Sequence, residues 1–265
     1  MSLQGVFAPM VRAYFKNLYG GGSGGDADAI IKAFAENTPC SLVSDAVTKV
    51  VEEAFEGAQV IEVNFPNADS VGYNAFNVAV PLVSASFASA KTIGNFAFLG
   101  CSNLENINLP SAVTIGINAF QGCKKLTQIA LPCAETIESG VFHGCSKLSD
   151  VNLPLITAVP AHAFYNCEAI KKIDLPSVVS IGQNAFNYCN SLTAAILRTT
   201  STVCVADLSA FDDTPMFTGE GHIYVPSAMF EYYRAGYDPA MTEAGYAGLF
   251  DIMFRKIEDY PEICG

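Results

Sequence analysis

The segment Ile115–Pro132 reads IGINAFQGCKKLTQIALP, and close variants of it recur along most of the chain. Its phenylalanine belongs to a series whose members are 22 residues apart, except for a first interval of 21. The members of this series are Phe55, Phe76, Phe98, Phe120, Phe142, Phe164 and Phe186. A fixed period of this length indicates a repeat architecture, because each unit can bury its apolar side only against its neighbours.

Cysteine follows the same period, three positions after the phenylalanine. It recurs at Cys101, Cys123, Cys145, Cys167 and Cys189. A disulfide framework would be expected to have uneven spacings in a small, loop-rich chain. The regular spacing therefore predicts one structural position per unit, filled by stacked free thiols, for which cysteine is a good small buried residue.

Each unit predicts the same local structure. The stretch Leu126–Leu131 ends in alternation of apolar and polar residues, which favours a short strand, and Pro132 ends it. Asn118–Phe120 is expected to form one helical or 3₁₀ turn that inserts the phenylalanine into the core. A positive φ at a tight corner is expected for a column of glycines, which are Gly72, Gly94, Gly116 and Gly182. Seven such units over residues 44–197 predict a repeat solenoid of the α+β class.

The string Ile115–Leu126, followed by a Leu-x-x-Ile-x-Leu-Pro piece, closely resembles the BspA-like leucine-rich-repeat family. The resemblance covers residues 44–197 and implies a right-handed coil with a parallel β-sheet face. It departs from the pattern at Ala58 and Ala79, which occupy the cysteine position, and at Pro160, which replaces a glycine. Members of this family are often bacterial surface proteins that bind host or matrix proteins, and such arrays also occur in phage-associated genes.

The flanking segments predict caps and a tether. The expected divisions are an amphipathic helix at 1–19, a Gly-rich linker at 20–25, an N-terminal cap helix at 26–43 and an α/β C-terminal cap at 198–265. Within the C-terminal cap, a strand at 222–226 and a helix at 228–235 are expected, with Gly236 ending the helix.

The helix at 1–19 has three interpretations. It docks on the solenoid, or it serves for oligomerisation or attachment, or it binds a membrane surface. The last is the least favoured because its polar face is poor in Lys and Arg. The same segment lacks the layout of a signal peptide, and no run of 18 apolar residues predicts a membrane-spanning helix.

Charge and residue types argue against several functions. The formal net charge of −12 disfavours nucleic-acid binding. No Cys-x-x-Cys or His-x-x-x-His pair predicts a zinc site, and no cofactor is expected. Of the three histidines, His143 and His162 are interpreted as surface residues, and His222 opens a strand of the cap without an evident partner. A hydrolase in the C-terminal cap that uses His222 or Asp212 is the least favoured hypothesis, and no catalytic residue is assigned.

What remains is the outward side of the predicted strands. Alternation places a set of polar side chains there as the candidate partner-binding face, namely Glu105, Asn106, Asn108, Gln128, Asp150, Asn152, Lys171, Lys172 and Asp174. The leading hypothesis is a non-enzymatic binding or adhesion scaffold for a protein or glycan, presented on a bacterial surface. The alternative is a structural or receptor-binding component of a phage particle, attached or oligomerised through residues 1–19.

Overall fold

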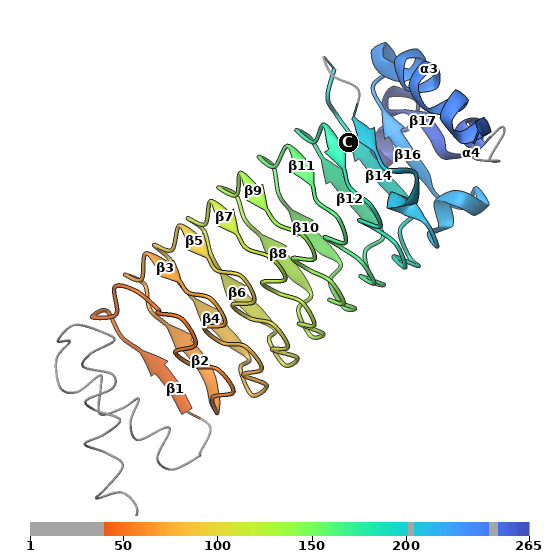
Figure 1. Ribbon diagram of the computed structural model, residues 1–265. Helices are drawn as coiled ribbons and strands as arrows, with labels where there is room; N and C mark the ends of the chain where they lie inside the picture. Colours follow the sequence, from red (N-terminus) through yellow and green to blue (C-terminus); the bar gives the residue numbers. More distant parts are fainter. Residues whose placement is uncertain (1–39, 201–203, 244–248, 265) are drawn as a thin grey trace, which may run out of the picture.

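The repeats stack into one elongated parallel β-solenoid (Figure 1). This computed structural model describes residues 40–200, 204–243 and 249–264. The expected helix at 1–19, the linker at 20–25 and most of the cap at 26–43 lie outside these residues. Each coil has three sides: one strand of a first sheet, one strand of a second sheet, and a turn that carries the repeating phenylalanine.

The first sheet contains the longer strands. In chain order they are β1 (Cys40–Val43), β2 (Val60–Asn64), β4 (Ser84–Ser86), β6 (Asn106–Asn108), β8 (Gln128–Ala130), β10 (Asp150–Asn152), β12 (Lys172–Leu175), β14 (Ala194–Leu197), β16 (His222–Val225) and β17 (Phe254–Lys256). They pair in three hydrogen-bonded groups, β1-β2-β4-β6, β8-β10 and β12-β14-β16-β17, and all pairs are parallel. Within the repeats, residues one repeat apart stand opposite each other, as Ser84 does to Asn106. Because the side chain leans to alternate faces along a strand, this register keeps each apolar column inside the coil.

The second sheet is built from strands of two residues. They are β3 (Ser70–Val71), β5 (Thr92–Ile93), β7 (Thr114–Ile115), β9 (Thr136–Ile137), β11 (Ala158–Val159), β13 (Ser180–Ile181) and β15 (Val205–Ala206). In β3 to β13 the first residue of the pair faces outward and the second is buried, as in Thr92 and Ile93.

The repeating phenylalanines form a continuous stack through the core. Neighbouring rings have centroids 5.0–5.6 Å apart and interplanar angles of 2–22°. All seven rings are fully buried. The backbone N–H of each phenylalanine donates to the carbonyl just before the phenylalanine of the next coil, as from Phe98 to Ala119 at 2.8 Å. The same turn thus provides both the stacked ring and a link between coils.

The stack continues past the expected end of the array at residue 197. Phe211 stacks on Phe186 at 5.2 Å, although 25 residues separate them. Strand β15 pairs with β13, and β16 pairs with β14. The coil geometry therefore extends through Val225, because a longer loop still returns the chain to the same hydrogen-bonding positions.

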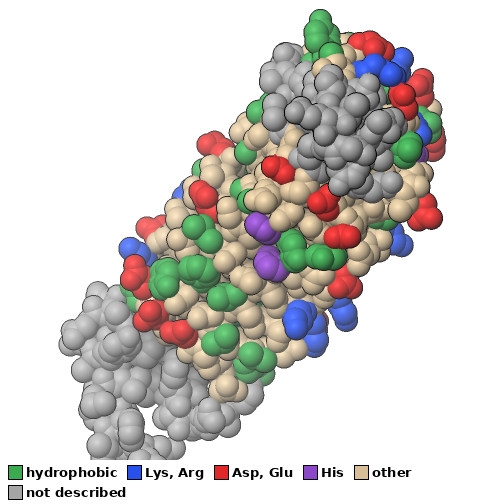
Figure 2. All heavy atoms as spheres, turned by 45° about the vertical axis from the view of Figure 1, so that its right-hand side comes forward, with side chains coloured by type: hydrophobic (Ala, Val, Ile, Leu, Met, Phe, Trp, Pro, Cys, Tyr) green, Lys and Arg blue, Asp and Glu red, His purple; other side chains and the backbone are tan. Residues whose placement is uncertain are grey.

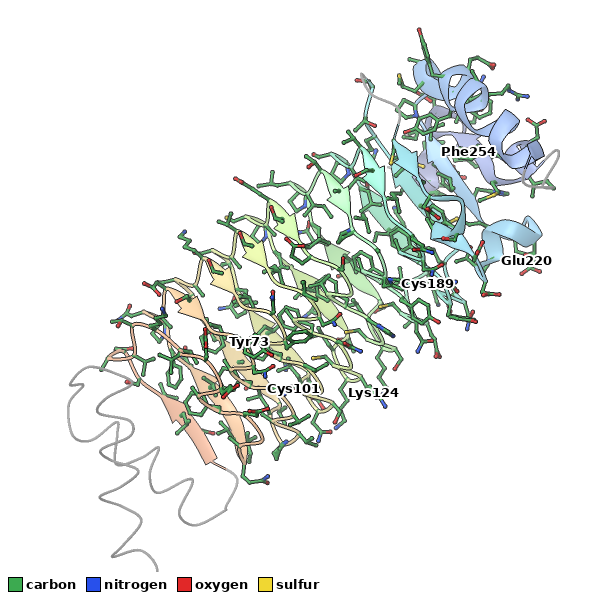
Figure 3. All side chains as sticks on the ribbon, viewed as in Figure 1. Tyr73, Cys101, Lys124, Cys189, Glu220 and Phe254 are labelled. Carbon is green, nitrogen blue, oxygen red and sulfur yellow. The ribbon has the colours of Figure 1, made fainter. Side chains whose placement is uncertain are left out.

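The cysteine position is buried, and its thiols are free, as the spacing predicted. Each thiol donates to the carbonyl of a phenylalanine one coil earlier, at 3.0–3.3 Å. Cys101 and Cys189, labelled in Figure 3, lie near the two ends of this column. Burial raises the pKa of Cys101, Cys145 and Cys189 to about 12, so these thiols remain protonated near neutral pH.

The expected positive φ of the first glycine column is wrong. Gly94 is not among the residues with positive φ; a Cβ built on it would lie 2.6 Å from the carbonyl carbon of Gly72. Gly116 would meet the backbone of Asn95 equally closely. At these glycines the backbone of the preceding coil approaches so closely that only a hydrogen fits on the Cα, whereas Glu138 and Pro160 occupy the same column in two later coils.

The expected helical turn is also not what forms around the phenylalanine. The chain makes successive turns, and the residues two positions before and two positions after the phenylalanine have a positive φ. Asn118 and Gly122 occupy these positions around Phe120, with φ of 52° and 74°. Gly and Asn adopt this left-handed conformation readily, whereas other residues pay about 1–2 kcal/mol. Val78 has φ of 48° in an equivalent position and is one such costly residue.

The ends of the array differ from the expected caps. Residues 40–43 form strand β1 rather than part of a cap helix, because they pair with β2. At the other end the described elements are η1 (Leu208–Phe211), η2 (Pro215–Thr218), α3 (Ser227–Glu243), α4 (Leu249–Met253), η3 (Ile257–Asp259) and α5 (Pro261–Cys264). Helix α3 runs past Gly236, since a glycine inside a helix costs only about 1 kcal/mol relative to alanine.

Replacing Phe120 by alanine is expected to lower the free energy of unfolding by about 3–5 kcal/mol, because a fully buried ring is removed from the middle of the stack. Chemical denaturation measures the loss. Phe96→Ala is the control, because Phe96 is only half-buried and lies outside the stack. Equal losses for the two variants would contradict a stack on which stability depends.

The buried thiols are expected to resist alkylation in the folded protein. N-ethylmaleimide followed by peptide mass mapping should modify the exposed Cys133 rapidly and the five stacked cysteines only as the chain unfolds. Raising the pH from 7 to 9 should accelerate these five little, because the pKa of Cys101, Cys145 and Cys189 stays near 12. Rapid native-state labelling at any of them would show that the column is open to solvent.

Candidate functional site

The candidate face is the outward side of the first sheet between β6 and β12, called here the sheet face. Its nine predicted side chains are Glu105, Asn106, Asn108, Gln128, Asp150, Asn152, Lys171, Lys172 and Asp174. Eight of them are exposed, and only Asp174 is half-buried. The structure therefore brings residues from four successive coils onto one surface.

The strands place these side chains by simple alternation. In β8, Gln128 and Ala130 face outward while Ile129 between them is buried. Strand β10 pairs with β8 so that Asp150 stands beside Gln128. Strand β6 lies next to β8, and β10 lies next to β12. Polar groups on neighbouring strands are consequently about 4.8 Å apart in rows across the sheet.

Contacts within the sheet face are weak where the side chains are exposed. Lys125 and Glu105 form an ion pair of 3.4 Å between side chains that are both about half exposed. The amide of Asn108 donates to the Ser86 hydroxyl at 3.0 Å. An exposed ion pair of this kind contributes about 0–1 kcal/mol, so a partner can replace it at little cost.

The C-terminal end of the sheet is covered by the chain itself. Alternation along β14 places Ala194 and Ile196 on its outer side, yet both are buried. They belong to a small apolar cluster, separate from the main core, that also contains Tyr224, Ile257, Tyr260, Ile263 and Cys264. The segment 257–264 thus folds back onto the outer side of β14 and β16.

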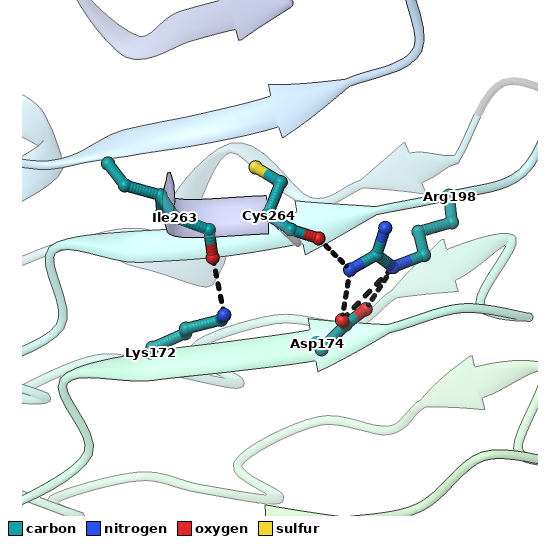
Figure 4. Close-up of polar contacts among 5 residues, drawn as sticks. All are labelled: Lys172, Asp174, Arg198, Ile263 and Cys264. Atoms are coloured by element: carbon teal, nitrogen blue, oxygen red, sulfur yellow. Dashed lines mark hydrogen bonds and ion pairs between the residues drawn. The ribbon is translucent and has the colours of Figure 1, made fainter. Parts of the chain in front are cut away.

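Polar contacts fix this segment at the margin of the sheet face (Figure 4). Arg198 binds Asp174 through both carboxylate oxygens, with Nη2 to Oδ2 at 2.6 Å and Nε to Oδ1 at 2.9 Å. Arg198 also donates to the carbonyl of Cys264, and Lys172 donates to the carbonyl of Ile263. The hydrogen bond to Asp174 raises the pKa of Arg198, so its guanidinium stays charged.

Sequence reasoning did not find Arg198 or the covering segment. Arg198 lies 24 residues from Asp174 and 66 from Cys264, so no periodic pattern connects them. Lys172 and Asp174 were predicted as binding residues, and the structure shows them in contact with residues 198 and 263 instead of only with solvent.

The histidines and acidic residues form no recognisable catalytic or metal arrangement in the described segments. His143 and His162 lie on the turn side, half-buried, and both contact the ring of Tyr165. His222 places Nδ1 3.0 Å from the carbonyl oxygen of Ile252. Within residues 40–200, 204–243 and 249–264, no three His, Cys, Asp or Glu residues converge to hold a metal ion. Over the same residues, no helix combines the length and apolar character needed to cross a membrane.

A parallel solenoid with stacked phenylalanines, buried cysteines and an exposed polar sheet is the architecture of a leucine-rich-repeat protein. The family described as the BspA type leucine-rich repeat region matches in six copies, over residues 32–134 and 113–226. The chain belongs to this family, as its repeat unit predicted.

Solved structures of bacterial leucine-rich-repeat proteins resemble the chain. The protein of T. pallidum is 25% identical, with a TM-score of 0.52, and the match covers 58% of this chain and 77% of that one. For the protein of Eubacterium ventriosum the identity is 26%, the TM-score 0.53 and the coverage 59% and 44%. The protein of Bacteroides ovatus is 21% identical at a TM-score of 0.50, covering 83% and 66%, and shows the fold alone. No curated protein matches the chain.

Replacing Arg198 by methionine is expected to loosen the covering segment. Hydrogen exchange of peptides from residues 257–264 should become faster. The free energy of unfolding should fall by about 1 kcal/mol, because the lost hydrogen bond is between charged groups but both side chains are partly exposed. Lys125→Met, which removes an exposed ion pair, should change neither quantity. Unaltered exchange in the Arg198 variant would mean that the apolar cluster alone holds the segment.

Proposed function

We propose that the protein is a non-enzymatic scaffold that binds a protein partner through the sheet face. The observation that carries this proposal is the set of eight exposed polar side chains on the strand side of four successive coils. An extended surface of this kind is what stacked repeats offer to partners. A rigid sheet also lowers the entropy lost on binding, because the strands are ordered before the partner arrives.

The composition of the sheet face favours a polar protein epitope. Its exposed acidic groups, Glu105 and Asp150, lie on the first and third of the four coils, and its basic groups, Lys171 and Lys172, lie on the fourth, where Asp174 is paired with Arg198. Amide side chains separate them, and each amide can both donate and accept a hydrogen bond. This arrangement supports a partner whose charges are ordered in the opposite sense, since complementary charge sets orientation and association rate.

The proposal includes presentation outside the cell, on a bacterial surface, as is frequent in the BspA-like family. Oligomerisation or attachment through residues 1–19 stays a prediction, because these residues lie outside the described structure. The same holds for the alternative of a phage component attached through that segment.

Binding to a panel of immobilised extracellular-matrix proteins tests the proposal. The full chain is compared with a triple variant, Asn106→Arg, Gln128→Arg and Asn152→Arg, which adds bulk and charge across three strands of the sheet face. We expect at least a tenfold weaker Kd by surface plasmon resonance for the variant, because unmatched charge in an interface is costly.

The matched control carries the same three charges on the second sheet, as Thr92→Arg, Thr136→Arg and Ala158→Arg, at exposed positions. It should bind as the unmodified chain does. An equal loss in this control, or no binding of the unmodified chain to any matrix protein, would remove the sheet face as the site.

A further inference from the structure

The turn side carries a cluster of aromatic rings that has no part in the core or in the sheet face. Tyr165 lies at its centre, with ring centroids 4.8 Å from His143, 5.7 Å from His162 and 5.3 Å from Tyr188. Figure 2 views this side: two His side chains lie together between groups of hydrophobic side chains, and Lys and Arg side chains lie toward the margins. We call these four residues the ring cluster.

Two members of the ring cluster occupy backbone positions where glycine or asparagine would be cheaper. His162 has φ of 58° two positions before Phe164, where the preceding coil has Gly140. Tyr188 has φ of 59° two positions after Phe186, where an earlier coil has Gly144. Sister coils therefore show that the fold does not require bulky residues there.

Burial does not compensate for this strain. Tyr188 is 42% exposed, so much of its ring remains in water. Backbone strain of this kind is frequent at functional sites, where a sequence departs from what folding alone favours. Glu53, Val78 and Phe96 have a similar φ in other coils, but His162 and Tyr188 combine the strain with ring contacts to Tyr165, which makes the ring cluster a candidate binding site.

Hydrogen-bonding groups adjoin the rings. The amide nitrogen of Asn184 lies 3.3 Å from Nε2 of His162, and the amide of Asn187 donates to Oδ1 of Asn184 at 3.4 Å. The backbone N–H of Asn184 bonds to the Ser209 hydroxyl at 3.3 Å, which holds this residue in place. Donors and acceptors are thus fixed beside the ring faces.

The ring cluster combines aromatic faces with hydrogen-bonding side chains. Burial, and secondly the neighbouring His162, lower the pKa of His143, which favours its neutral imidazole. A surface of rings and amides fits a ligand with apolar C–H faces and many hydroxyl groups. Such a ligand satisfies both the rings, by stacking, and the amides, by hydrogen bonds.

We propose that the ring cluster is a carbohydrate-binding site. The C–H face of a pyranose ring packs on Tyr188, and its hydroxyls bond to Asn184 and to the imidazoles of His143 and His162. This site lies on the turn side of the solenoid, so it is independent of the protein-binding function proposed for the sheet face.

The test is affinity gel electrophoresis of the full chain in gels that contain soluble starch, xylan, mixed-linkage β-glucan, yeast mannan or gastric mucin. At least one of these should retard the unmodified chain. Tyr188→Gly should weaken that retardation at least tenfold while raising Tm by about 2–4 °C, because glycine relieves the strained φ. A merely structural tyrosine would not give both results.

Val78→Gly is the matched control. Val78 occupies the position equivalent to Tyr188 in an early coil and is also strained and exposed, with φ of 48°. It should gain thermal stability and keep full saccharide binding. Tyr165→Leu, which leaves a residue of ordinary φ in place, should lose binding and provides a second variant if Tyr188→Gly fails to fold.

Absence of retardation in every gel would overturn the carbohydrate assignment, and so would full binding by both the Tyr188 and the Tyr165 variants. The arginine variant of the sheet face should still bind the saccharide. Loss of saccharide binding in that variant would place the sugar site on the sheet face. Failure of the unmodified chain to bind matrix proteins would contradict the proposed function but not the carbohydrate site.

Discussion

Backbone hydrogen bonding between successive coils is the interaction on which this protein depends. Each turn of the chain returns to the next coil at a separation fixed by that bonding, so residues one repeat apart must lie in contact. The repeating phenylalanine contributes twice to this contact between coils. Its backbone N–H donates to the next coil, and its ring stacks on the ring of that coil. An isolated coil would expose both faces of its ring, and for that reason stability grows only as coils stack.

The same constraint explains why glycine appears in two columns for two different reasons. Gly94 is needed because the neighbouring backbone leaves no room for a Cβ, whereas Gly122 is needed because its φ is positive. At Tyr188 a bulky residue adopts this positive φ. The conformation is destabilising, and the partly exposed side chain offsets little of that cost. A bulky residue at such a position is not required by the solenoid fold, so its role lies at the surface.

The two surfaces differ in chemistry because they arise from different parts of the coil. The strands present alternating side chains at regular spacing, which makes the sheet face a row of separated charges and amides. The turns place residues four positions apart in left-handed conformations, and there aromatic side chains of neighbouring coils meet. The C-terminal segment adds a boundary, because residues 257–264 cover the outer side of β14 and leave the sheet face ending near Asp174.

The sequence by itself determined the repeat, the buried phenylalanine and cysteine columns and the family, because a fixed period places equivalent residues in equivalent surroundings. It also placed the residues of the sheet face on one side, from simple alternation around residues such as Ile129. Only the tertiary structure decided the eighth stacked ring at Phe211, the course of α3 and the pairing of Arg198 with Asp174 and Cys264. These features depend on contacts across irregular distances along the chain, where periodicity carries no information. The ring cluster lies between the two cases, since its residues stand in regular columns but their strain and mutual contact are visible only in three dimensions.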